Sequence, residues 1–169
     1  MLMCHVAGAA QEVFCGRAAQ GARGLLSTAE RCMRMKYQTV MIVDDEERFV
    51  QTTTKIFERL GYSVLSAVRG EEALGLLEGR DIGVVLMDVS MPGMSGIETL
   101  AEIKKRHPLV EVIMITGTLS RDMASEGFRL GAFDFLLKPV SIGDIVKKVE
   151  DAFAKRRGIE EKLRSARDA

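Results

Sequence analysis

Five short apolar runs alternate with amphipathic segments from Thr39 onward, and this alternation constrains the fold more than any other feature of the sequence. The runs are short enough for strands, whereas the apolar residues between them recur every three or four positions, as in helices. Strands that alternate with helices predict a parallel sheet that is covered by helices, an α/β fold of five βα units. The expected strands are residues 39–44, 62–67, 82–88, 110–115 and 133–137.

The segments between and after these runs predict five helices. Ser95 is expected to cap the third helix, which runs to about Arg106 before His107-Pro108. The fourth, at about 121–130, is expected to be the weakest, because Gly127 interrupts it and its apolar face is thin. The inward faces of the first helix and of the second, at about 70–78, are expected to hold Phe49, Thr53, Ile56, Phe57 and Leu60, and Ala73, Leu74 and Leu77, respectively.

Composition excludes several classes of protein. The chain has 169 residues, of which 47% are hydrophobic and 28% charged, as is usual for one globular domain with some spare length. Its formal net charge of 0 gives no electrostatic reason to expect nucleic acid or an anionic membrane as a partner. No apolar run approaches the roughly 20 residues that span a bilayer, so we expect a soluble protein. The cysteines are odd in number and match no metal-binding spacing, which favours the reducing cytoplasm.

The two ends of the chain differ from its middle. Residues 1–36 are rich in Ala, Gly and Arg and lack a helical or strand period, which predicts a disordered tail or a start placed too far upstream. Their few acidic residues also make them similar to an organelle presequence, the less favoured interpretation. Residues 37–157 form the predicted domain, and residues 158–169 a short helical tail.

Reactive side chains stand where four of the apolar runs end. Asp44 and Asp45 end the first run, Asp88 the third, Thr116 the fourth and Lys138 the fifth. In an open parallel sheet, ligands bind beyond the carboxyl ends of the strands, where the strand order reverses. We therefore expect these side chains to meet in one crevice.

Such a cluster is suited to phosphoryl transfer. Carboxylates about 4 Å apart repel by about 4 kcal/mol at an effective dielectric near 20, so the acids demand a cation. Hard oxygen ligands beside a phosphate point to Mg²⁺, which Asp44 and Asp45 would hold. Asp88 would be the nucleophile that forms an aspartyl phosphate, while Lys138 and the Thr116 hydroxyl would stabilise phosphoryl oxygens.

Each of these residues also has a simpler interpretation. Asp44 and Asp45 are as well suited to cap the first helix, and Asp88 to be a turn residue before Pro92. Lys138 alone would usually be a solvated surface lysine, and Thr116 alone a strand-end threonine. The joint arrangement favours the chemical interpretation, because independent caps would not fall at four strand ends of one sheet.

Four motifs in register resemble the receiver domain of two-component response regulators, over about residues 37–157. The resemblance implies a flavodoxin-like (βα)₅ fold, a three-layer sandwich whose five parallel strands have the order 2-1-3-4-5. It also implies Mg²⁺-dependent transfer of a phosphoryl group to Asp88 from a sensor histidine kinase or a histidine phosphotransfer protein. The motifs are MIVDDE (41–46), LMDVSMPGMSG (86–96), ITG (115–117) and FLLKP (135–139).

The resemblance also assigns further roles. Ser90 would offer its backbone carbonyl to Mg²⁺, beside Asp44, Asp45 and Asp88, and the Lys138–Pro139 peptide would be cis. Thr116 would move toward the phosphate while Phe135 turns inward, which would reshape the face of the fourth helix, fifth strand and fifth helix. Phe135 removes any hydroxyl hydrogen bond from this switch.

Several functions stay open at this point. The leading one is a stand-alone receiver that signals to an unknown protein target by contact and catalyses only its own phosphorylation and dephosphorylation. A phosphorelay intermediate, a fragment of a larger regulator or hybrid kinase, and a phosphorylation-dependent homodimer are alternatives, as is a non-catalytic scaffold. Phosphohydrolases with an aspartyl-phosphate intermediate place a second Asp two residues after the nucleophile, and Ser90 in that position argues against them.

Overall fold

The computed structural model describes residues 38–168, within which five strands alternate with five helices. The predicted extension, residues 1–36, lies outside the described residues. The strands are β1 (Thr39–Val43), β2 (Ser63–Ala67), β3 (Val84–Asp88), β4 (Glu111–Thr116) and β5 (Asp134–Leu137). The helices are α2 (Glu47–Arg59), α3 (Gly70–Leu77), α4 (Gly96–Arg106), α5 (Arg121–Leu130) and α6 (Ile142–Arg167).

The five strands form one parallel sheet in the order β2-β1-β3-β4-β5. This confirms the predicted flavodoxin-like fold and its strand order. In the register of the central strands, Val43 pairs with Met87 and Asp88 with Ile115. Asp44 and Asp88 therefore follow paired residues on adjacent strands, which brings both to the same edge of the sheet.

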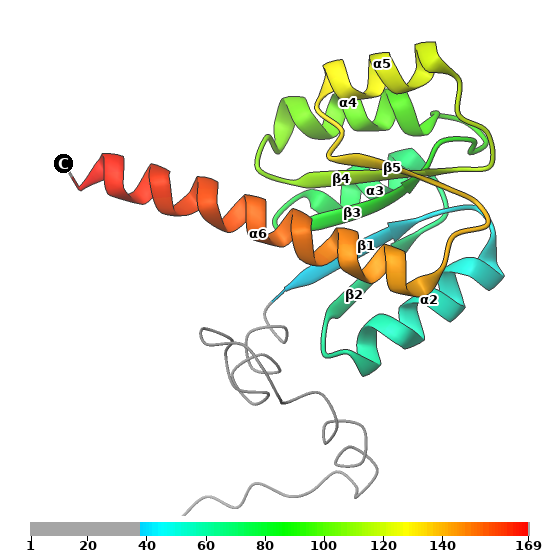
Figure 1. The fold of residues 1–169 in the computed structure, drawn as a ribbon, viewed down its shortest axis with the longest axis horizontal. Helices are drawn as coiled ribbons and strands as arrows, with labels where there is room; N and C mark the ends of the chain where they lie inside the picture. The colour runs from blue at the N-terminus through cyan, green and yellow to red at the C-terminus, as the bar shows by residue number, and fades with distance from the viewer. Residues whose placement is uncertain (1–37, 169) are drawn as a thin grey trace, which may run out of the picture.

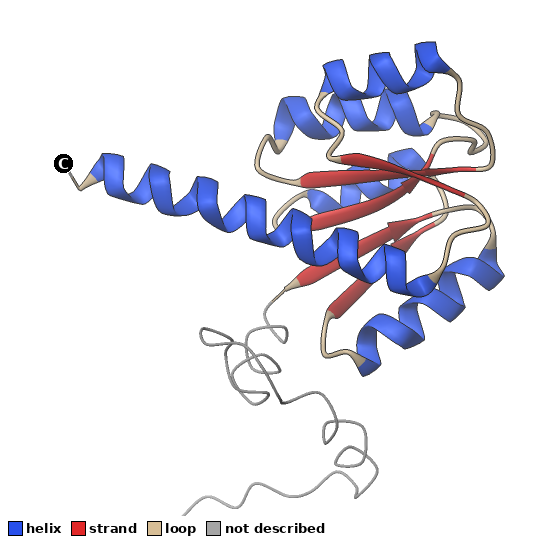
Figure 2. Ribbon diagram, viewed as in Figure 1, coloured by secondary structure: helices blue, strands red, loops and turns tan. Residues whose placement is uncertain are grey.

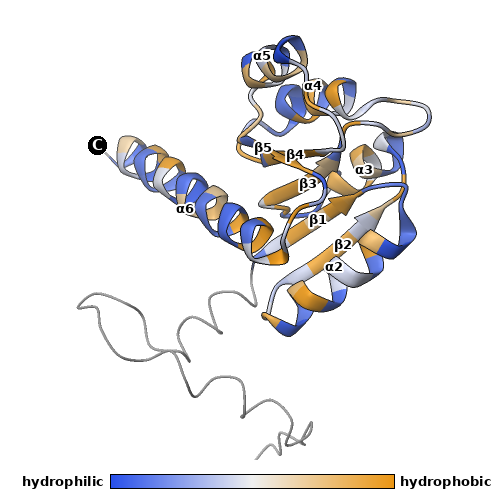
Figure 3. Ribbon diagram, turned by 45° about the vertical axis from the view of Figure 1, so that its right-hand side comes forward, coloured by the Kyte–Doolittle hydropathy of each residue, from blue (hydrophilic) through white to orange (hydrophobic). Residues whose placement is uncertain are grey.

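Helices cover both faces of the sheet, which gives three layers (Figures 1 and 2). Alternate residues of β1 point to opposite faces: Met41 and Val43 pack under α3, α4 and α5, whereas Val40 and Ile42 pack under α2 and α6. Figure 3 shows hydrophobic residues along the central strands β1, β3 and β4. All but one of the residues in these strands are buried, so the backbone that carries the strand-end side chains is enclosed on both faces.

The helices agree with the sequence in most respects. Ser95 caps α4 as predicted, in a capping box in which its side chain accepts from the Glu98 N–H and Glu98 accepts from the Ser95 N–H. The residues predicted to face inward from α3 are buried. Of those predicted for the first helix, Thr53 and Phe57 are buried, whereas Phe49, Ile56 and Leu60 are only half-buried, and Val50 takes a buried position that the sequence did not indicate.

Gly127 does not interrupt α5, so that prediction is wrong. The helix continues through it, and Gly127 is buried. A β-carbon at this position would overlap the ring of Phe135 on β5. The glycine thus makes room for an aromatic ring and does not break the helix.

Helix α6 is longer than the sheet that it covers, and its C-terminal part projects away from the other elements (Figure 1). The predicted boundary after residue 157 falls inside this helix, because residues 158–167 continue it without a break. Arg156 anchors the helix to the connection between α3 and β3: its guanidinium donates to the Ile82 carbonyl at 2.7 Å and to Asp81 at 2.6 Å. Among the described residues, no helix is both long and apolar enough to cross a membrane.

Candidate functional site

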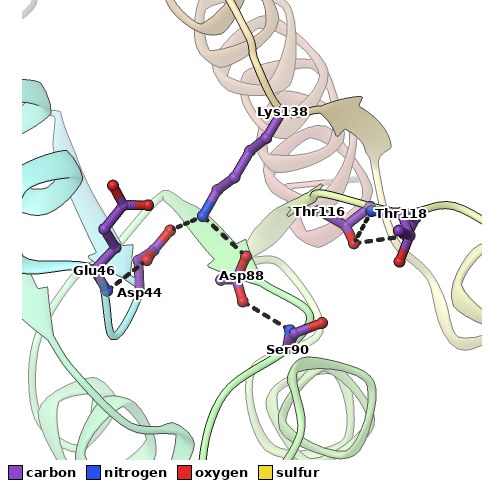
Figure 4. Close-up of polar contacts among 7 residues, drawn as sticks. All are labelled: Asp44, Glu46, Asp88, Ser90, Thr116, Thr118 and Lys138. Carbon is purple, nitrogen blue, oxygen red and sulfur yellow. Dashed lines mark hydrogen bonds and ion pairs between the residues drawn. The ribbon is translucent and has the colours of Figure 1, made fainter.

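The predicted site residues lie at the carboxyl edge of the sheet, as their positions in the sequence indicated (Figure 4). Asp88 is the last residue of β3 and Thr116 the last of β4, while Asp44 and Lys138 directly follow β1 and β5. The N–H of Lys138 donates to the Thr116 carbonyl at 2.8 Å, which fixes the backbone of the lysine beside β4. The Lys138–Pro139 peptide is cis, as predicted.

Lys138 joins the two buried acids. Its Nζ lies 2.6 Å from Asp44 Oδ2 and 3.1 Å from Asp88 Oδ1 (Figure 4). The side chains of Asp44 and Asp88 are only 2% and 6% exposed, whereas that of Lys138 is 23% exposed. One ammonium thus compensates two carboxylates that are almost without solvent, and the three groups together carry a charge of about −1.

The second oxygen of each carboxylate accepts from a backbone N–H two residues further along the chain. Asp44 Oδ1 accepts from Glu46 N at 2.8 Å, and Asp88 Oδ2 accepts from Ser90 N at 2.7 Å. Both acids are therefore oriented in the same way, with one oxygen on a loop amide and the other on Lys138. Hydrogen bonds from both sides hold each carboxylate plane in place.

Burial and mutual repulsion set the ionisation of this group. Desolvation raises the pKa of Asp44, and the charge of Asp88 adds to this, although Lys138 and the Glu46 N–H oppose it. Burial by itself lowers the pKa of Lys138, but the hydrogen bonds and charges of Asp44 and Asp88 outweigh it, so that this pKa is raised. The two acids therefore hold the lysine in its charged form.

Asp45 does not join the other two acids in this structure. Its side chain is exposed, and within residues 38–168 no three His, Cys, Asp or Glu side chains gather closely enough to hold a metal ion. The expected meeting of Asp44, Asp45 and Asp88 is thus not seen: Lys138 compensates the buried pair, and Asp45 turns to solvent. The remaining negative charge and the carboxylate oxygen donors nevertheless fit a hard cation such as Mg²⁺, with Asp45 next to Asp44 in the chain.

Thr116 is fully buried, but its hydroxyl points to its own loop. Oγ1 donates to the Thr118 carbonyl at 2.7 Å and accepts from the Thr118 N–H at 3.3 Å (Figure 4). The Thr116 hydroxyl therefore lies at the same carboxyl edge of the sheet as Asp44 and Asp88, but both of its hydrogen bonds are made to the β4–α5 connection.

Residues 40–150 match the family described as the response regulator receiver domain. The chain belongs to this family. Receiver domains of this kind are components of two-component signal transduction.

Curated relatives of the receiver are regulators with much longer chains. The chain is 35% identical over 113 residues to the DNA-binding transcriptional regulator NtrC of Klebsiella pneumoniae, which covers 67% of this chain and 24% of the relative. It is 32% identical over 127 residues to the transcriptional regulatory protein ZraR of Salmonella typhimurium, covering 75% and 29%. The receiver thus spans about a quarter of the length of these relatives.

Solved structures of receivers share its fold. The response regulator receiver domain protein of Clostridium thermocellum has 32% identity and a TM-score of 0.68, over 72% of this chain and 98% of that one. The CheX–CheY–BeF3–Mg complex of Borrelia burgdorferi has 30% identity and a TM-score of 0.65, over 69% of this chain and 89% of that one.

Phe135 lies on β5 of the receiver, on the side covered by α5. The ring is half-buried, and Phe128 of α5 packs against it edge-on, with 5.2 Å between ring centroids. Phe128 is itself 52% exposed, so this pair links the interior to the surface. The predicted switch aromatic therefore lies against α5, where it contacts both the buried Gly127 and the exposed ring of Phe128.

Two further residues shape the site without having been predicted to do so. The ring of Phe49, in the first turn of α2, has its centroid 5.0 Å from Lys138 Nζ. Gly96 lies so close to the Asp88 carbonyl that a β-carbon would overlap it. The motif around Gly96 was a signal for the glycine, whereas the apolar spacing of α2 assigned Phe49 only to the core.

Proposed function

We propose that this receiver accepts a phosphoryl group on Asp88 from the phosphohistidine of a sensor histidine kinase or a histidine phosphotransfer protein. The observation that carries the proposal is the setting of Asp88: a buried strand-end carboxylate held between the Ser90 N–H and the Lys138 ammonium. A carboxylate fixed in this way is a preorganised nucleophile, and the adjacent ammonium lies where negative charge develops.

The transfer exchanges one bond to phosphorus for another. An oxygen of Asp88 forms the new P–O bond while the P–N bond to the histidine breaks, and the electron pair of that bond stays on the imidazole nitrogen. Lys138 shifts its charge from the carboxylate of Asp88 to a phosphoryl oxygen, and the Thr116 hydroxyl leaves Thr118 to donate to another. Positioning and charge stabilisation then account for the catalysis that the receiver supplies to its own modification.

Mg²⁺ would be held by the side chains of Asp44, Asp45 and Asp88 and by the backbone carbonyl of Ser90. When bound, it neutralises phosphoryl oxygens and the crowded acids, which is the usual role of Mg²⁺ beside a phosphate. The net negative charge of the Asp44–Lys138–Asp88 group supports this assignment. Asp45 would need to turn from solvent toward Asp44 to complete the site.

The output of the receiver is proposed to be a protein contact at α5, β5 and α6. Movement of Thr116 toward the phosphate would vacate space beside β4, and Phe135 would follow it inward. The exposed Phe128, which packs on Phe135, would then report that movement to a partner protein. The DNA-binding activity in the name of a longer relative is not assigned to residues 38–168.

The lability of the phosphate tests this function. The protein is incubated with a phosphorylated histidine kinase domain and Mg²⁺, and the product is treated with hydroxylamine, which cleaves acyl phosphates but not phosphoserine or phosphothreonine. We expect phosphate that hydroxylamine releases, together with altered amide hydrogen exchange in α5, β5 and α6. Hydroxylamine-resistant phosphate, or exchange in these elements that is unchanged with phosphate bound, contradicts the proposal.

A further inference from the structure

An aromatic ring is the third partner of the Lys138 ammonium. Phe49 stands in the first turn of α2 and is half-buried, and its ring centroid lies 5.0 Å from Lys138 Nζ. This is within the roughly 6 Å at which the negative face of an aromatic ring attracts a cation. The ammonium thus contacts side chains from three parts of the fold: Asp44 after β1, Asp88 on β3 and Phe49 on α2.

The three partners differ in what phosphorylation would do to them. The contact with Asp88 is replaced when its carboxylate becomes an acyl phosphate, and the contact with Asp44 weakens if a cation takes up its charge. The attraction of the Phe49 ring depends on neither carboxylate, because it arises from the ring's own quadrupole. It persists while the other two contacts are exchanged.

We propose that Phe49 is a positioning residue for Lys138, whose ring keeps the ammonium at the site before and during phosphoryl transfer. The position of the ammonium in the unmodified protein does not depend on the function proposed above, whereas its position during phosphoryl transfer rests on that function. Phe49 also packs against the core beneath α2. A loss of stability in a Phe49 variant would therefore not show whether the ring positions Lys138 or only fills the core.

The chain offers a matched control for this test. Phe133 is also half-buried and packs against the same core, and its ring centroid lies 5.3 Å from a different ammonium, that of Lys155. Phe49→Leu and Phe133→Leu therefore delete the same kind of contact from two different lysines. Phe49→Tyr keeps the aromatic face and serves as the rescue.

The first measurement is the order parameter of the lysine ammonium groups from ¹⁵N relaxation, on the unphosphorylated protein. We expect Phe49→Leu to loosen Lys138 and leave Lys155 unchanged, Phe133→Leu to do the reverse, and Phe49→Tyr to resemble the wild type. An unchanged order parameter of Lys138 in Phe49→Leu, or an equal loosening in Phe133→Leu, overturns the inference. If the leucine variant fails to fold, Phe49→Met replaces it with the same expectation.

The second measurement is the rate of phosphorylation by acetyl phosphate with Mg²⁺. We expect Phe49→Leu to be about two- to fivefold slower than the wild type, the loss that corresponds to one partly exposed cation–π contact. Phe133→Leu and Phe49→Tyr should keep the wild-type rate, and an unchanged rate in Phe49→Leu removes Phe49 from the transfer. If the wild type takes up no phosphate, the proposed function fails, while the order parameters still decide the position of Lys138.

Discussion

Gly96, the first residue of α4, lies directly against the backbone carbonyl of Asp88, the last residue of β3. The N–H of Gly96 also donates to the Val89 carbonyl at 3.0 Å. A β-carbon on Gly96 would overlap both the carbonyl oxygen of Asp88 and the Cα of Val89, and backbone atoms cannot swing away as a side chain does. The start of α4 therefore defines where the proposed phosphoacceptor stands.

Gly96→Ala should destabilise the domain by about 2–3 kcal/mol, since overpacking against backbone forces the chain to shift. It should also slow phosphorylation, because the displaced backbone carries Asp88. Urea unfolding and the rate of modification by acetyl phosphate measure the two effects. Gly143→Ala is the matched control: it lies in the first turn of α6, is exposed, and has only the Ser141 hydroxyl within 4 Å of its β-carbon. Equal stabilities of the two variants would contradict this interpretation of Gly96.

Gly127→Ala should destabilise the domain by about 1–3 kcal/mol, although alanine is the better helix former. The new methyl group would collide with the ring of Phe135 and force it to move. The exposed Gly75 of α3 has no atom near its β-carbon, so Gly75→Ala should stabilise by about 0.5–1 kcal/mol. Chemical unfolding of both variants measures this difference, and a stabilising Gly127→Ala would show that the ring does not need the space.

Removal of the negative charge of Asp44 and removal of the positive charge of Lys138 should change the stability of the domain in opposite directions. Asp44→Asn leaves a matched Lys138–Asp88 pair, so the free energy of unfolding should rise by about 1 kcal/mol. Lys138→Met leaves two buried carboxylates uncompensated and should lower it by about 3 kcal/mol. Both are measured by urea unfolding with a chelator present. An Asp44→Asn protein that is less stable than the wild type would contradict the expected cost of burying Asp44 beside the charge of Asp88.

The advantage of Asp44→Asn should depend on pH. Because the pKa of Asp44 is raised above its ordinary value of 3.8, chiefly by burial, the folded state binds more protons than the unfolded state above that pH. The contribution of Asp44 to the free energy of unfolding of the wild type therefore falls as the pH rises through the raised pKa. The asparagine of the variant does not titrate. Unfolding curves between about pH 4 and pH 7 should show the gap between the two proteins widening with pH. A gap that narrows with rising pH would reverse the sign assigned to Asp44.

The sequence predicted the framework of the site because strands and strand ends are local features. The apolar runs before Asp44, Asp88, Thr116 and Lys138 form the strands, and the order of a parallel sheet brings their ends together. Contacts between segments that are distant in the sequence could not be predicted in the same way. The spacing of α2 marked Phe49 as a core residue, and only the folded chain brings it to Lys138.

Other departures have the same origin. Gly127 resembles a helix breaker when its neighbours in space are unknown, and its role becomes clear once Phe135 lies against it. In the unmodified protein Lys138 pairs with both buried acids, while Asp45 is exposed and the Thr116 hydroxyl bonds to Thr118. Which side chains a site engages depends on its charge state, and sequence patterns do not encode that state.

The most direct test of the central claim is the mass of the intact protein after incubation with acetyl phosphate and Mg²⁺. We predict that the wild type gains the mass of one phosphoryl group and that Asp88→Asn gains none. Omission of Mg²⁺ should abolish the gain, and Asp45→Asn should slow it at limiting Mg²⁺. A wild type that gains no mass, or an Asp88→Asn protein that gains as much as the wild type, would contradict the assignment of Asp88 as the phosphoacceptor.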